Sequence, residues 1–106
     1  MVSQKCECFR HYYLIMELLK DANRVLKSCS SGSEDLMECK EVTREYVLNA
    51  LLEEREMESD CGVSFSEFRR VLNEAIDELE KSNSSEDLAV VQELLKTAKE
   101  KLWNCR

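Results

Sequence analysis

The segment 64–81 reads SFSEFRRVLNEAIDELEK, and it determines the fold class more clearly than any other part of the chain. Its apolar residues recur at helical spacing, at Phe65, Phe68, Leu72, Ala75, Ile76 and Leu79. This spacing places them on one face of an α-helix that packs against a core. Ser64 and Glu67 have the spacing of a capping box, in which a serine begins the helix and a glutamate reaches back to it. We therefore predict a helix over 65–81.

Three other segments have the same periodicity, and we predict further helices over 8–27, 34–58 and 86–103. Serines precede acidic residues at two of these starts, so we expect Ser33 to cap the second helix and Ser84 or Ser85 to cap the fourth. The short connections cannot run back along a bundle about 30 Å long, because an extended chain covers at most about 3.5 Å per residue. We therefore predict a single all-α domain over 1–106, a four-helix antiparallel up-down-up-down bundle.

The composition of the 106 residues excludes several other classes of protein. The chain has no proline and only two glycines, so an all-β sandwich or a phosphate-binding loop lacks the turn residues that it would need. Its net charge of −7 would repel phosphates, and we expect no nucleic-acid partner. No uninterrupted apolar stretch reaches the roughly 18 residues of a transmembrane helix, so we expect no membrane insertion.

Six cysteines in a short chain favour an oxidising, extracellular compartment, because disulfides persist there. The first residues lack the apolar region of a signal peptide, which leaves two interpretations: a cytosolic protein with reduced thiols, or a mature secreted protein. The number of cysteines favours the second interpretation. In the predicted topology, Cys29 and Cys39 lie at one pole of the bundle and are expected to pair. The other four cysteines fall at the opposite pole, and their pairing stays open: Cys6, Cys8, Cys61 and Cys105. The prediction is thus three disulfides that staple the two poles.

The sequence offers little for catalysis or metal binding. His11 is the only histidine, whereas a di-iron bundle needs two Glu-x-x-His motifs. Cys6 and Cys8 could supply two zinc ligands, but no second close pair completes a site. Cys8 and His11 lie one turn apart without a third residue to orient the imidazole. We therefore expect no enzyme activity, no cofactor and no metal, and we interpret His11 as a half-buried, hydrogen-bonded side chain.

Acidic residues are concentrated in the second predicted helix, since residues 29–60 contain ten of them and only three basic residues. Five lie near its end, where the helix dipole disfavours anions: Glu53, Glu54, Glu56, Glu58 and Asp60. Leu48 and Leu52 lie just before them, outside the core stripe. These seven residues form a candidate interface for a basic partner, and the alternative is a solvated surface that aids solubility. On the first interpretation, reversing Glu53, Glu56 and Asp60 to lysine should slow association while stability stays unchanged or rises.

The first predicted helix carries more apolar residues than one core-facing stripe needs. Its expected stripe is Phe9, Tyr12, Ile15, Leu19, Ala22 and Leu26. Beside the stripe lie Leu14, Leu18 and Val25, which could belong to an interface, to the core or to a ligand cavity. The core stripe expected for the second helix is Leu36, Cys39, Val42, Tyr46, Ala50 and Met57. Between the third and fourth helices, Asn83-Ser84-Ser85 is a candidate N-glycosylation site at Asn83.

In size, helicity, disulfides and acidity the chain is similar to small salivary proteins of blood-feeding arthropods, such as the anophensin-type proteins of anopheline mosquitoes. Those proteins inhibit host complement or contact activation by binding proteins. The chain also resembles short-chain helical cytokines in bundle size and in having a cysteine near each end, Cys6 or Cys8 with Cys105. Cytokines of that type have long crossover connections, which this chain lacks. Neither resemblance extends to a motif that matches residue by residue.

Both resemblances imply binding of an extracellular protein. We therefore expect a secreted, acidic, non-enzymatic protein-binding module, an inhibitor or effector that acts on extracellular host proteins of the complement or coagulation type. A cytokine-like receptor ligand is one alternative. A small hydrophobic-ligand carrier is the other, and it would need an internal cavity.

Overall fold

A computed structural model describes residues 9–30, 35–62 and 65–102 of the chain, and this part is all-α, without a β-strand. Its elements are α2 (Phe9–Ser30), α3 (Leu36–Cys61), α4 (Ser66–Lys81), the short 3₁₀ helix η1 (Ser85–Asp87) and α5 (Leu88–Glu100). All four predicted helices are confirmed, with boundaries shifted by a few residues. No described helix is both long enough and apolar enough to cross a membrane.

Helix α3 begins and ends with clear backbone signals. The carboxylate of Asp35 accepts a hydrogen bond from the Met37 N–H at 3.2 Å, so Asp35 is the N-cap. The predicted cap, Ser33, lies outside the described residues. At the other end Gly62 adopts φ 71°, a left-handed conformation that glycine tolerates, and its N–H donates to the Glu58 carbonyl at 2.8 Å.

The starts of the last two helices differ from the predicted caps. Helix α4 follows Phe65, whose side chain makes no capping hydrogen bond, and the predicted cap Ser64 lies outside the described residues. Before α5, the chain forms the 3₁₀ turn η1 where a serine cap was expected, and the α-helix begins at Leu88. The Asp87 carboxylate stabilises this connection by accepting the Asn83 N–H at 3.0 Å.

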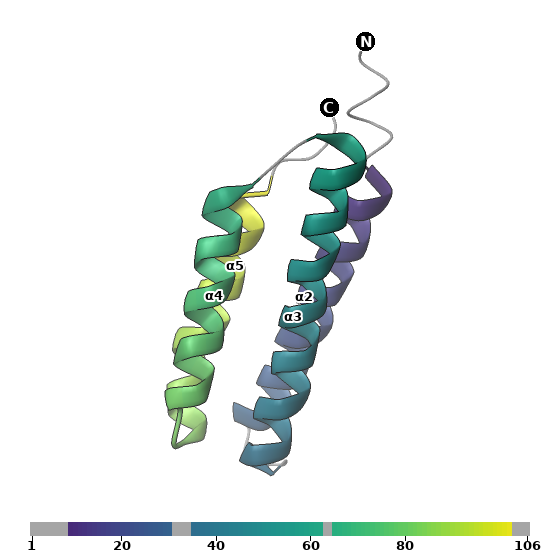
Figure 1. The fold of residues 1–106 in the computed structure, drawn as a ribbon. Coiled ribbons are helices and arrows are strands. Elements are labelled where there is room, and N and C mark those ends of the chain that lie inside the picture. The colour runs from purple at the N-terminus through teal and green to yellow at the C-terminus, as the bar shows by residue number, and fades with distance from the viewer. Residues whose placement is uncertain (1–8, 31–34, 63–64, 103–106) are drawn as a thin grey trace.

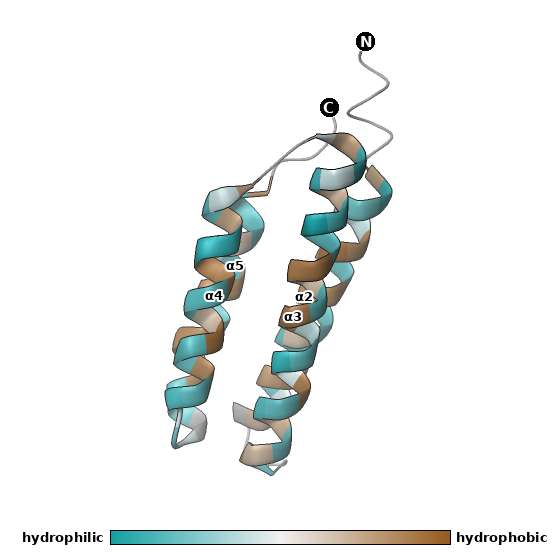
Figure 2. Cartoon of the chain, in the orientation of Figure 1, coloured by the Kyte–Doolittle hydropathy of each residue, from teal (hydrophilic) through white to brown (hydrophobic). Residues whose placement is uncertain are grey.

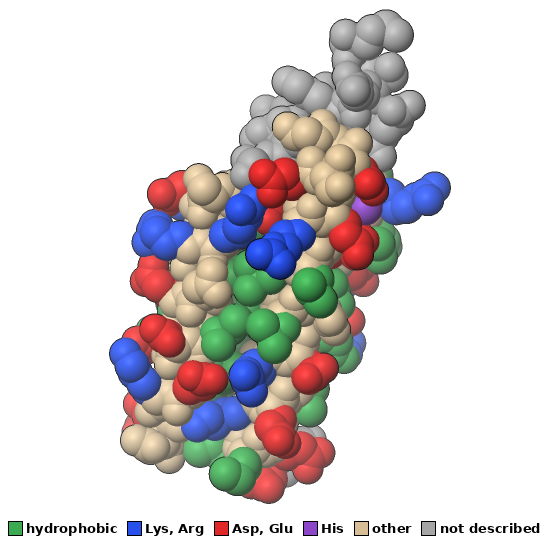
Figure 3. All heavy atoms as spheres, viewed as in Figure 1, with side chains coloured by type: hydrophobic (Ala, Val, Ile, Leu, Met, Phe, Trp, Pro, Cys, Tyr) green, Lys and Arg blue, Asp and Glu red, His purple; other side chains and the backbone are tan. Residues whose placement is uncertain are grey.

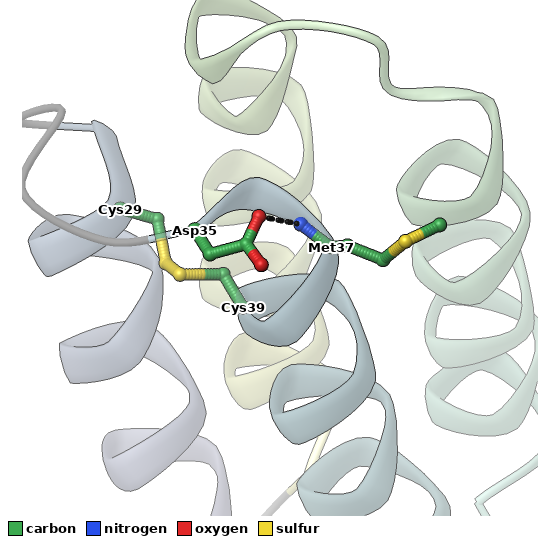
Figure 4. The surroundings of a disulfide bond; sticks show 4 residues. All are labelled: Cys29, Asp35, Met37 and Cys39. Atoms are coloured by element: carbon green, nitrogen blue, oxygen red, sulfur yellow. Dashed lines mark hydrogen bonds between the residues drawn. A yellow bond between two sulfur atoms is a disulfide. The ribbon is translucent and has the colours of Figure 1, made fainter.

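The helices pack as two antiparallel hairpins (Figure 1). In the first hairpin, Cys29 near the end of α2 is bonded to Cys39 near the start of α3, with their Cα atoms 6.2 Å apart (Figure 4). In the second, α5 lies beside α4 (Figure 1). Helices α3 and α4 run in opposite directions, as a contact between Arg69 at the start of α4 and Glu54 near the end of α3 shows. Lys40, near the start of α3, donates to the carbonyls of Glu80 and Ser82 at the end of α4.

The core lies between the two hairpins, and most of the stripe predicted for the third helix lies in it. Buried residues of α4 are Phe68, Val71, Leu72, Ala75 and Leu79, and those of α5 are Leu88, Val91, Leu95 and Ala98. From α2 they meet Ile15, Leu19, Ala22 and Leu26. Along each helix, hydrophobic and hydrophilic residues alternate at helical spacing (Figure 2). The period of the sequence therefore identifies these buried faces correctly.

The core stripe predicted for α3 is partly wrong. Val42 is 36% exposed and Tyr46 is half-buried. The buried face instead contains Cys39, Thr43, Val47, Ala50, Glu54 and Met57. The reason is that α3 contacts α2 on one side and α4 on the other, so its buried face points between them. That direction is rotated by about one residue from the most apolar face of the isolated helix.

The apolar excess of α2 resolves into different environments. Leu18 and Val25 are half-buried against the core, so they are part of the packing. Leu14 is 42% exposed and Phe9 is 49% exposed. Phe9 was expected in the core stripe, but it stands at the first described position of the helix. Only some of the extra apolar residues of α2 therefore pack against the core.

The predicted Cys29–Cys39 disulfide is confirmed, and both cysteines are buried. At the opposite pole Cys61 is half-buried and is also disulfide-bonded. The pairing expected among Cys6, Cys8, Cys61 and Cys105 lies outside the described residues.

Candidate functional site

The imidazole of His11 lies between two carboxylates of α3. Its Nδ1 is 2.5 Å from Oε2 of Glu53, and its Nε2 is 3.0 Å from Oδ2 of Asp60. The side chain is 16% exposed, so the prediction of a half-buried, hydrogen-bonded histidine is confirmed. Its partners were not predicted as such, although both belong to the acidic end of the second predicted helix.

The antiparallel pairing of α2 and α3 explains this contact. His11 stands in the first turn of α2 and therefore faces the last turns of α3. Glu53 and Asp60 are seven residues apart, which places them two turns apart on the same side of a helix. The imidazole fits between them and joins the start of one helix to the end of the other.

These contacts shift the pKa of His11. Burial alone would lower it, but the hydrogen bonds and negative charges of Glu53 and Asp60 outweigh burial and raise the pKa above its usual value of 6.5. When both ring nitrogens carry a proton, each can donate to one carboxylate. The protonated ring therefore neutralises part of the acidic end of α3.

Glu54 has a different environment from its neighbours in the sequence. It is fully buried, and its Oε1 is 2.6 Å from Nε of Arg69. Its Oε2 accepts the backbone N–H of Phe65 at 3.1 Å. Glu54 therefore holds the start of α4 against α3 and cannot contact a partner protein. Glu54 is therefore removed from the predicted interface.

A sequence signal for the burial of Glu54 exists. It lies four residues after Ala50 and three before Met57, which is the register of a buried helix face. Glu58, one turn later, meets the same guanidinium, with Nη2 of Arg69 at 2.6 Å from its Oε1. Glu58 is exposed but already engaged in this ion pair.

Four of the seven predicted interface residues form a single exposed row on α3, which we call the α3 row. They are four residues apart and lie one turn above another: Leu48, Leu52, Glu56 and Asp60. Leu48 is 37% exposed and Leu52 is 55% exposed. Figure 3 shows hydrophobic side chains along the middle of α3 with charged side chains around them. The structure thus keeps an apolar segment next to acidic residues on one surface.

The different environments of Glu53, Glu56 and Asp60 change the expected effect of reversing their charges. Glu53 and Asp60 are hydrogen-bonded to His11, so lysines at these positions would remove two contacts and repel the imidazolium. We therefore expect reversal of Glu53 and Asp60 to lower the free energy of unfolding. The Glu56 side chain is exposed and makes no hydrogen bond or ion pair within the described ranges, so it can be changed without that loss.

His11, Glu53 and Glu56 also bring together donor atoms that bind metal ions. One ligand atom from each residue can be chosen so that all three lie within 4.8 Å of one another. Two of these side chains come from α3 and one from α2, so spacing along the sequence did not reveal the group. The candidate glycosylation residue, Asn83, is exposed in the connection between α4 and α5.

Comparison with known proteins adds no relative. The sequence matches no known protein family and no curated protein, and the fold matches no solved structure.

Proposed function

We propose that the chain is a secreted, non-enzymatic module that acts by binding another protein. In this proposal it is an inhibitor or effector of extracellular host proteins of the complement or coagulation type. The complete chain would be an up-down-up-down bundle in which three disulfides staple the two poles. The partner would present a basic surface.

The α3 row is the observation that supports this proposal. Leu48 and Leu52 expose apolar side chains on a helix whose backbone is held by packing on both sides. Glu56 continues the row with a negative charge. Apolar side chains on a rigid element can serve as anchors in an interface. Neighbouring charges raise the rate of encounter with a surface of opposite sign.

The proposal is tested by capture from plasma with matched surface variants. The disulfide-intact protein is immobilised, and retained plasma proteins are compared for wild type, Leu52→Glu and Val90→Glu. Val90 is a suitable control because it is 49% exposed on α5, much like Leu52 on α3. We expect a plasma protein retained by wild type and by Val90→Glu but lost from Leu52→Glu. Equal retention by all three proteins, or no retained protein, would contradict the proposal.

Two alternatives predict different partners. A cytokine-like receptor ligand would bind a cell-surface protein, so capture from cell-surface extract and not from plasma would favour it. A hydrophobic-ligand carrier would retain a small molecule during native mass spectrometry of protein from its natural source. Carrier pockets usually enclose about 300–1,000 Å³. The groove between the start of α3 and the end of α4 is smaller, about 260 Å³, and it is open to solvent.

A further inference from the structure

We propose that His11, Glu53 and Glu56 bind one divalent transition-metal ion, and that Zn²⁺ is a fitting ion for this donor set. The proposal does not depend on the protein-binding function above, since it rests on the side chains at the junction of α2 and α3 alone.

The donor set is the first argument. Imidazole nitrogen and carboxylate oxygens are the usual nonsulfur ligands of Zn²⁺, and sites with three protein ligands complete their coordination with water. Ca²⁺ instead takes six to eight oxygen ligands, and Mg²⁺ prefers oxygen ligands and retained waters. A single imidazole with two carboxylates therefore favours Zn²⁺ over either hard cation.

Metal binding requires small movements of the ligand side chains, and the surroundings of Glu56 allow them. The three ligand atoms lie within 4.8 Å of one another. Around a tetrahedral zinc ion with bonds of about 2.1 Å, ligand atoms are about 3.4 Å apart. The Glu56 side chain is exposed and makes no hydrogen bond or ion pair in the described part of the chain, so it can approach the other two ligands.

Asp60, which lies outside the three ligands, holds the imidazole in a suitable orientation for metal binding. Nδ1 of His11 faces Glu53, while Nε2 faces Asp60 at 3.0 Å. In metal sites the ligating histidine commonly donates its other ring N–H to a carboxylate, which fixes the tautomer and the ring direction. Asp60 is thus a positioning residue, and the ion would take the place of the proton between Nδ1 and Glu53. That proton is released to the solvent.

The test is titration of the chelator-treated, disulfide-intact full chain with ZnCl₂ in a calorimeter. We expect one Zn²⁺ per chain, and binding at least tenfold weaker in both His11→Gln and Glu56→Gln. Asp60→Asn should weaken binding roughly 10–100-fold, the usual effect of losing such a carboxylate. Glu45→Gln is the matched control, because Glu45 is an exposed glutamate elsewhere on α3, and it should bind as wild type does. CaCl₂ should give no comparable binding.

A spectroscopic readout locates the ion. His11 is the only histidine of the chain, so its ring nitrogens are identified without ambiguity in ¹⁵N NMR spectra. Zn²⁺ should shift the Nδ1 signal while Nε2 keeps its proton. Circular dichroism of each zinc-free variant checks that its helices are intact.

Absence of Zn²⁺ binding would overturn the proposal. So would binding of unchanged strength in the His11→Gln and Glu56→Gln variants, because the ligands would then lie elsewhere. Neither result bears on the Leu52→Glu experiment, so failures of the two proposals are distinguishable.

Discussion

The carboxylate of Glu54 is fully buried and lies 2.6 Å from Nε of Arg69, which reaches it from the first turns of α4. Arg69 itself is about one-third exposed, with 32% of its side-chain surface accessible. A buried carboxylate is tolerated when its charge and hydrogen-bonding capacity are matched. Here the guanidinium supplies the charge and the Phe65 N–H supplies a further donor. The pair joins the two hairpins at one pole of the bundle.

Replacing Arg69 by methionine should therefore destabilise the protein strongly. The change leaves the Glu54 carboxylate buried without its counter-charge, which typically costs about 3–5 kcal/mol. The free energy of unfolding is measured by urea denaturation. Arg70→Met is the matched control, because Arg70 is exposed and pairs only at the surface of α4, with Glu67 and Glu74. Its loss should cost no more than about 1 kcal/mol. Equal losses in the two variants would contradict the importance of the buried pair.

The contacts of His11 predict a pH-dependent stability of the chelator-treated protein. Because the folded-state pKa is raised above the value of 6.5, the protonated ring stabilises the folded state. This contribution is complete below the unfolded pKa and is lost as the pH rises through the folded pKa. Urea unfolding from about pH 5 to about pH 9 should show the loss, and His11→Gln should flatten it. An NMR titration that gives His11 a pKa at or below 6.5 would refute this prediction.

Removal of the Cys29–Cys39 disulfide should lower stability without disturbing the far pole. The bond joins two buried residues ten positions apart, and such cross-links typically contribute about 2–4 kcal/mol. Thermal and urea unfolding of the Cys29→Ala, Cys39→Ala double variant measure the loss. Partner binding through the α3 row should persist, because the row ends at the other pole. Peptide mapping of the wild-type protein should link Cys29 to Cys39, and a different partner for either would contradict the structure.

The charge of the α3 row should affect association once a partner is captured. Glu56→Lys and Glu45→Lys change the net charge equally, and both residues are exposed on α3. Only Glu56 lies in the row, so its reversal should slow association more, above all at low salt. Surface plasmon resonance at two ionic strengths measures the rates. If the two variants associate equally fast, the acidic end of α3 is only a solvated surface.

The sequence by itself determined the helices and several of their buried faces. Phe68, Leu72 and Leu79 recur with the period of a helix, and their burial follows from local geometry alone. The Cys29–Cys39 bond was also predictable, because a short connection brings the end of one helix to the start of the next. Such features depend on residues close together in the chain.

Tertiary structure alone decided which partners the acidic residues at the end of α3 meet. Glu53 and Glu54 are adjacent and chemically identical, yet the first pairs with His11 of α2 and the second is buried beside Arg69 of α4. Successive helical residues point about 100° apart, so the positions of α2 and α4 around α3 decide which neighbour each side chain meets. Periodicity indicates that a helix has a buried face. The register of Ala50 and Met57 places Glu54 on that face. Which neighbouring helix each side chain meets is set by the packing of α3 against α2 and α4, and the spacing along the chain does not contain it.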